Sequence, residues 1–142
     1  MKFLIDTSAV INIIQQRSED ALYFLQDQIT LDLAFYEAGN VIRTMFHRGD
    51  LDRTDALNLG SDLADVWKLM NVVNYSSLDM NNILDLALDL DIAFYDAAFL
   101  VQSRELDIPF VTDDQPLQKK IPKSLSWMSS DEYILKLTVP DE

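Results

Sequence analysis

The feature that most constrains this chain is that its two clearest apolar runs each stop abruptly at acidic residues. The run 3–5 ends at Asp6, and the run 108–111 is followed by the segment 112–114, Thr-Asp-Asp. Longer segments between these runs place their apolar residues at helical spacing. Short strands separated by helices are typical of a parallel sheet covered on both faces. The pattern therefore predicts an α/β fold, with a short central parallel sheet flanked by helices on both sides.

The length and composition predict one domain over residues 1–142. A chain of 142 residues can bury a core without disulfides, and three glycines and four prolines leave little room for long linkers. The absence of cysteine excludes zinc–thiolate sites and cysteine nucleophiles. Asp6 interrupts the first apolar run too early for a signal peptide. No stretch approaches the ~20 apolar residues of a membrane helix, so we expect a cytoplasmic protein with no membrane partner.

Four acidic positions have neighbours that are unusual for solvated surface charges. Glu37 and Asp96 lie within apolar and aromatic segments, whereas Asp6 and Asp114 each close a strand. A carboxylate in such surroundings is costly unless it is hydrogen-bonded, paired or bound to a cation. The carboxyl ends of parallel strands meet at one edge of a sheet, where a hard divalent cation such as Mg²⁺ or Mn²⁺ would relieve repulsion between carboxylates. Such ions can activate a water for phosphodiester hydrolysis.

Each of these acidic residues also has an ordinary structural explanation. Asp6 could be a helix N-cap, a role worth about 0.5–2 kcal/mol. Glu37 and Asp96 could be charges on helix surfaces, and Asp113 with Asp114 could belong to a turn. Position alone does not decide between the two explanations, but the order of the four positions along the chain adds information.

In that order, the acidic residues and their neighbours resemble the motifs of PIN-domain nucleases, and the size and layout resemble the VapC-type toxins of toxin–antitoxin pairs. The four motifs are Asp-Thr-Ser after a strand, a glutamate with an asparagine three residues on, an aspartate after an aromatic residue, and a strand closing in Thr-x-Asp. The matching residues are Asp6, Thr7 and Ser8; Glu37 and Asn40; Tyr95 and Asp96; and Thr112, Asp113 and Asp114. Together they span nearly the whole chain.

The resemblance implies a metal-dependent endoribonuclease that acts as the toxin of a type II toxin–antitoxin system. The residues that would hold Mg²⁺ or Mn²⁺ are Asp6, Glu37, Asp96 and Asp114. The residues that would orient those carboxylates or waters are Thr7, Ser8, Asn40, Thr112 and Asp113, with Asp113 open as an alternative ligand to Asp114. The implied partners are an RNA substrate, a cognate antitoxin and a second copy of the chain. A PIN-like domain that has lost activity and serves as an interaction module is the alternative.

The net charge of −13 argues against a nucleic-acid substrate, because most RNA-binding surfaces are basic. Two bound divalent ions would raise the charge only by four, to −9, so a metal site does not account for the acidity. Two small groups of basic residues follow Glu37 and Asp114 and could contact RNA phosphates. They are Arg43, His47, Arg48 and Arg53, and Lys119, Lys120 and Lys123. They could equally be solubilising surface residues.

Overall fold

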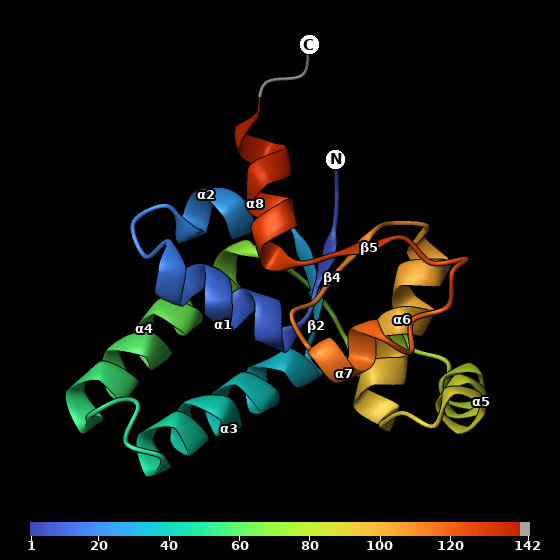
Figure 1. Cartoon of the computed structure of the whole chain (residues 1–142), viewed down its shortest axis with the longest axis horizontal. Helices are drawn as coiled ribbons and strands as arrows, with labels where there is room; N and C mark the ends of the chain where they lie inside the picture. Colours follow the sequence, from blue (N-terminus) through green and yellow to red (C-terminus); the bar gives the residue numbers. More distant parts are fainter. Residues whose placement is uncertain (140–142) are drawn as a thin grey trace.

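The computed structural model describes residues 1–139, and its strands form one five-stranded sheet in the order β3-β2-β1-β4-β5 (Figure 1). Every neighbouring pair of strands is parallel. The strands are β1 (Leu4–Ile5), β2 (Ile29–Leu31), β3 (Asn71–Val73), β4 (Phe110–Val111) and β5 (Trp127–Met128). The predicted short central parallel sheet is therefore confirmed.

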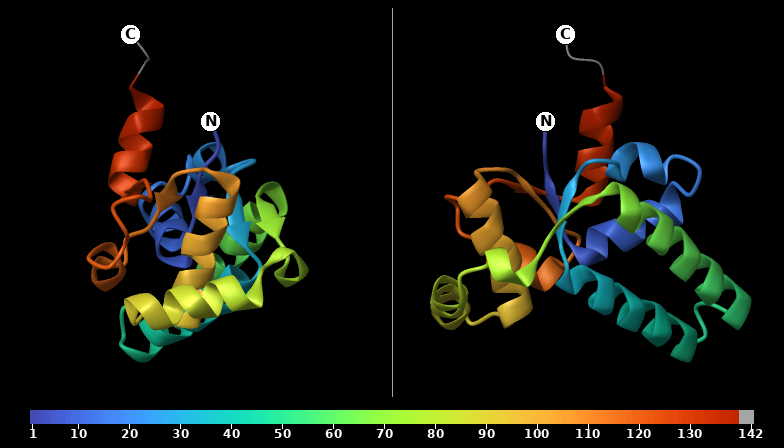
Figure 2. Two further views of the ribbon diagram at one scale, coloured as in Figure 1. Left: turned by 90° about the vertical axis from the view of Figure 1, so that its right-hand side faces the viewer. Right: turned by 180° about the vertical axis from the view of Figure 1, so that it is seen from behind.

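Helices cover both faces of the sheet (Figure 2). They are α1 (Thr7–Gln16), α2 (Ala21–Leu25), α3 (Leu33–His47), α4 (Arg53–Leu69), α5 (Met80–Leu90), α6 (Phe94–Leu106), α7 (Gln115–Gln118) and α8 (Ser130–Thr138), with a 3₁₀ turn at Tyr75–Ser77. None of the helices in residues 1–139 is long and apolar enough to cross a membrane.

The alternation of side chains along the strands divides the core into two layers. Ile5 and Val111 pack with α1, α2, α4 and α8 on one face of the sheet. Leu4 and Phe110, their neighbours along the strands, pack with α5 and α6 on the other face. Because successive strand residues point to opposite faces, both layers can be filled by strands of only two residues. The central strands are thus buried on both sides, and their carboxyl ends carry the polar residues.

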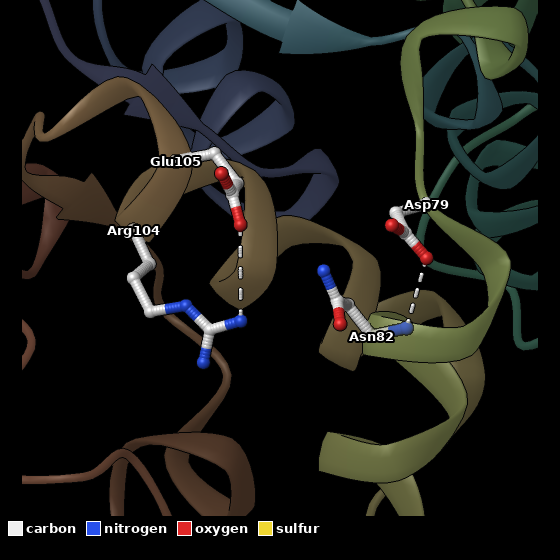
Figure 3. Close-up of polar contacts among 4 residues, drawn as sticks. All are labelled: Asp79, Asn82, Arg104 and Glu105. Atoms are coloured by element: carbon white, nitrogen blue, oxygen red, sulfur yellow. Dashed lines mark hydrogen bonds and ion pairs between the residues drawn. The ribbon is translucent and has the colours of Figure 1, made fainter.

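Side-chain caps fix where several helices begin. Asp79, for example, accepts a hydrogen bond from the Asn82 amide (3.1 Å) at the start of α5 (Figure 3). In the part of the chain that the structure describes, the only ion pair joins Arg104 to Glu105 (3.9 Å), and both side chains are about half exposed. An exposed pair of this kind contributes little to stability. Almost all of the acidic residues therefore lack a basic partner within the described part of the fold.

Candidate active site

A pocket of about 320 Å³ opens at the carboxyl ends of β1 and β4, and it contains all four carboxylates predicted to hold metal. Helices α1, α3, α6 and α7 converge at this end of the sheet (Figure 1). Asp6 follows β1, Glu37 lies in α3, Asp96 lies in the first turn of α6, and Asp114 lies after β4. The fold thus brings together four carboxylates that are far apart in the sequence.

Asp6 is the most deeply buried of the four, with 5% of its surface exposed. Its Oδ1 accepts hydrogen bonds from the Ala9 amide (3.0 Å) and the Ser8 hydroxyl (2.7 Å). Burial raises the pKa of Asp6 to about 7, against the opposing effect of hydrogen bonds from Thr112, Ala9 and Ser8, and the charge of Asp113 adds to the rise. Asp6 is the N-cap of α1 and also lines the pocket, so the capping explanation and the site explanation are compatible.

The other three carboxylates are linked by repulsion across the pocket. Partial burial raises the pKa of Glu37, a hydrogen bond from Thr7 lowers it, and the charge of Asp96 raises it again. Partial burial also raises the pKa of Asp96, and the charge of Asp114 adds to this. Asp114 is the N-cap of α7, where its Oδ1 accepts from the Leu117 amide (3.0 Å). The pocket therefore concentrates negative charge that nothing in the described chain neutralises.

Three of the predicted orienting residues contact the carboxylates. The Thr7 hydroxyl donates to Glu37 Oε1 (2.8 Å), and the Ser8 hydroxyl donates to Asp6. Thr112 is fully buried, hydrogen-bonds Asp6, and accepts from the Asp114 amide through Oγ1 (3.1 Å). These hydroxyls restrict the directions in which the carboxylates can point.

The structure does not bring Asn40 into the pocket. Its side chain is exposed, and its backbone carbonyl accepts from the Thr44 hydroxyl (3.0 Å). The α3 residues that line the pocket are Glu37, Val41 and Met45, a spacing of four that defines one stripe of the helix. Asn40, three residues after Glu37, lies beside that stripe.

Asp113 and Asp114 have different surroundings. Asp114 lines the pocket, whereas Asp113 faces α8 and accepts hydrogen bonds from Asn12 and Ser130. Consecutive residues of an extended segment point in opposite directions, so only one of the two can face the pocket.

The donor set fits a hard divalent cation in its chemistry. The carboxylate and hydroxyl groups that line the pocket present oxygen atoms, which are the ligand atoms that Mg²⁺ and Mn²⁺ prefer. Burial is the largest cause of the raised pKa values of Asp6, Glu37 and Asp96, and neighbouring carboxylates raise them further. Within residues 1–139, however, no three acidic or histidine side chains already form a group that could hold an ion.

Sequence reasoning missed several residues that shape the pocket. Ile11, Asn12 and Gln15 of α1, with Phe99 of α6, complete its lining. The helical spacing of the apolar residues in α1 was the available signal, but it does not reveal which residues face a neighbouring helix. No lysine or arginine is among the residues found to line the pocket. The two basic groups predicted to contact RNA lie outside it.

Comparison with known proteins places the chain among ribonucleases. It is 31% identical over 127 residues to ribonuclease VapC3 of Pyrobaculum aerophilum, and the alignment covers 86% of this chain and 96% of that relative. A scan against models of protein families found no match.

Solved structures share the fold at lower sequence identity. A crystal structure from Pyrobaculum aerophilum aligns with a TM-score of 0.77 and 20% identity, covering 96% of this chain and 95% of that one. VapBC2 of Rickettsia felis, bound to a fragment of promoter DNA, aligns with a TM-score of 0.64 and 11% identity, covering 91% of this chain and 98% of that one. A toxin–antitoxin complex from Klebsiella pneumoniae aligns with a TM-score of 0.62 and 14% identity, covering 89% of this chain and 96% of that one.

Proposed function

Because the chain belongs to the VapC family of ribonucleases, the toxins of type II toxin–antitoxin systems, we propose that it hydrolyses RNA phosphodiester bonds with divalent metal ions in the pocket described above. The residues that would hold Mg²⁺ or Mn²⁺ are Asp6, Glu37, Asp96 and Asp114. The observation that supports this proposal is that these carboxylates, from four separate segments, line one pocket without a basic residue to neutralise them.

Bound there, the metal ions would activate a water and stabilise the leaving oxygen of the phosphodiester. The chain itself supplies the frame for that chemistry. Ser8, Thr112 and the Ala9 amide hold Asp6, and Thr7 holds Glu37. Burial of Asp6 excludes bulk water from its carboxylate, which strengthens its interaction with any cation. No side-chain nucleophile is needed, in keeping with a pocket whose described lining contains no histidine, and a chain without cysteine.

Mn²⁺ should stabilise the protein against heat in proportion to occupancy of the pocket. An ion at 100 times its dissociation constant contributes about 2.7 kcal/mol to the free energy of unfolding. We expect the melting temperature to rise with Mn²⁺ in the wild type and in Asp89→Asn, a change on the exposed surface of α5. Asp96→Asn should lose most of this gain.

The same titration separates the proposal from the alternative of an inactive interaction module. A module without a competent metal site would show no melting shift with Mn²⁺ in the wild type. Equal shifts in the wild type and in Asp96→Asn would mean that Mn²⁺ binds elsewhere.

We further propose that the substrate is single-stranded or looped RNA in the cytoplasm, and that the chain forms a homodimer and binds a cognate antitoxin. One structural neighbour is a toxin–antitoxin complex by its name, and another is VapBC2 bound to promoter DNA. On this chain, two adjoining pockets between α1, α2 and α4 share Ile14, Ser18 and Asp62, and they are also lined by Asp55 and Asp65. These unpaired acidic residues favour a basic segment of the antitoxin as the occupant of the two pockets. Binding such a segment would account for part of the excess negative charge of the chain.

Charge reversal at Asp62 should therefore weaken antitoxin binding. Asp62→Lys places a like charge against a basic segment, and we expect the dissociation constant of the co-expressed antitoxin to rise at least about tenfold, equivalent to ~1.4 kcal/mol. Asp89→Lys, on the exposed surface of α5, is the matched control. Calorimetry measures both affinities, and unchanged binding by Asp62→Lys would place the antitoxin on another surface.

A further inference from the structure

Asp113 connects three parts of the chain that surround the active site. Its Oδ2 accepts hydrogen bonds from Asn12 Nδ2 of α1 (2.6 Å) and from the Ser130 hydroxyl of α8 (2.6 Å). Its Oδ1 accepts from the Ser130 amide (2.8 Å). The carboxylate therefore joins the middle of α1 to the first residue of α8, although more than a hundred positions separate Asn12 from Asp113.

The backbone of Asp113 is tied to the active site. Its amide donates to the Ser8 hydroxyl (3.0 Å), and that hydroxyl donates in turn to Asp6 Oδ1 (2.7 Å). The residues on either side of Asp113 are Thr112, which hydrogen-bonds Asp6, and Asp114, which lines the pocket. Any movement of Asp113 would thus displace two carboxylates of the site relative to each other.

The contacts of Asp113 are those of an anchored group. An ionised carboxylate only accepts hydrogen bonds, and both oxygens here already receive them from uncharged donors. Hydrogen bonds to a charged acceptor are about twice as strong as neutral ones, which suits a group that must fix a segment in place.

On the basis of the proposed function, we propose that Asp113 is a positioning residue. Through Ser130 and Asn12 it docks α8 against α1, and so holds Thr112 and Asp114 at the distance from Asp6 that the metal ions require. The C-terminal helix α8, which contributes no residue to the pocket lining, then affects catalysis through this one side chain.

Two adjacent serines provide a matched test. Ser130→Ala removes one hydrogen bond to Asp113, whereas Ser129→Ala removes the N-cap of α8, where the Ser129 hydroxyl accepts from the Glu132 amide (3.1 Å). Each change removes one hydroxyl that makes a hydrogen bond at the start of α8, but only Ser130→Ala removes a hydrogen bond to Asp113. Asp113→Asn is the stronger perturbation, since the amide that replaces the carboxylate presents a donor to groups that already donate.

The first readout is the amide NMR spectrum of the full chain without metal. The Ala9 amide donates to Asp6 and the Leu117 amide donates to Asp114, so their signals report where these carboxylates lie. We expect Ser130→Ala and Asp113→Asn to shift both signals and Ser129→Ala to leave them unchanged. Equal responses to Ser129→Ala and Ser130→Ala, or no shift in any variant, would overturn the positioning role whether or not the chain cleaves RNA.

The second readout is kinetic. Loss of a partner that orients metal ligands typically costs 10–100-fold in metal affinity or activity. We expect Asp113→Asn to lower kcat by about that factor at saturating RNA and to weaken Mn²⁺ binding, Ser130→Ala to do so less, and Ser129→Ala to lower only the melting temperature. Unchanged kcat and Mn²⁺ affinity in Asp113→Asn would refute the proposal, whereas an inactive wild type would refute the proposed function and leave the NMR comparison to decide this one.

Discussion

Replacing Asp6 with asparagine is expected to lower kcat/KM for RNA cleavage by more than about 100-fold while the protein stays folded. Loss of a residue that only orients a metal ligand already costs 10–100-fold, and Asp6 is the carboxylate that Ser8 and Thr112 orient. Asparagine has the same shape, and its carbonyl oxygen can still accept from the Ala9 amide and cap α1. Steady-state cleavage of single-stranded RNA with Mn²⁺ measures the effect.

Asp52→Asn is the matched control for that substitution. Asp52 is the N-cap of α4 and accepts from the Asp55 amide (2.7 Å), but its side chain is exposed and outside the pocket. It should keep wild-type activity. If both variants lost activity equally, or if Asp6→Asn stayed active, Asp6 would be a helix cap and nothing more.

The second large effect concerns stability and pH. In EDTA, the wild type should lose stability as pH rises from about 4 to about 7. Burial raises the pKa of Asp6 from 3.8 to about 7, so within this range the folded state binds more protons than the unfolded state, and the free energy of unfolding falls with pH. At ~1.4 kcal/mol per pKa unit, the loss approaches about 4 kcal/mol. The raised pKa values of Glu37 and Asp96 act in the same direction.

Asp6→Asn should lack the Asp6 part of this loss and should be more stable than the wild type at pH 8 without metal. Urea unfolding at pH 4 and pH 8 measures both free energies, with Asp52→Asn expected to follow the wild type. If the free energy of unfolding fell equally with pH in the wild type and in Asp6→Asn, the buried carboxylate of Asp6 would not be the source of the pH dependence. A buried carboxylate that weakens the fold in the absence of a cation is the stability cost expected of the proposed metal site.

The parts of the fold and site that the sequence predicted are those with local signals. Strands β1 and β4 were recognisable because the apolar runs 3–5 and 108–111, which contain them, each stop at acidic residues, and parallel sheets place such ends together. Asp6 and Asp114 line one pocket, as that argument requires, and Glu37 and Asp96, which the family resemblance added, line the same pocket.

The parts that were not predictable depend on contacts between distant segments. The stripe of α3 that faces the pocket is set by how α3 packs beside α1, and this leaves Asn40 exposed. Helix α7 spans only Gln115–Gln118, which is too short for a periodic pattern. The environment of Asp113 depends on Ser130, and nothing near Asp113 in the sequence indicates that contact.

The most direct test of the central claim is cleavage of a mixed single-stranded RNA pool by the wild-type chain, freed of any partner, before and after removal of metal. We expect cleavage with Mn²⁺ or Mg²⁺, none in EDTA, and recovery when the ion is returned in excess, because the carboxylates of the pocket cannot hydrolyse the phosphodiester without it. Cleavage that continues unchanged in EDTA, or RNA that stays intact with either ion in the folded protein, would contradict the assignment of this pocket as a metal-dependent ribonuclease site.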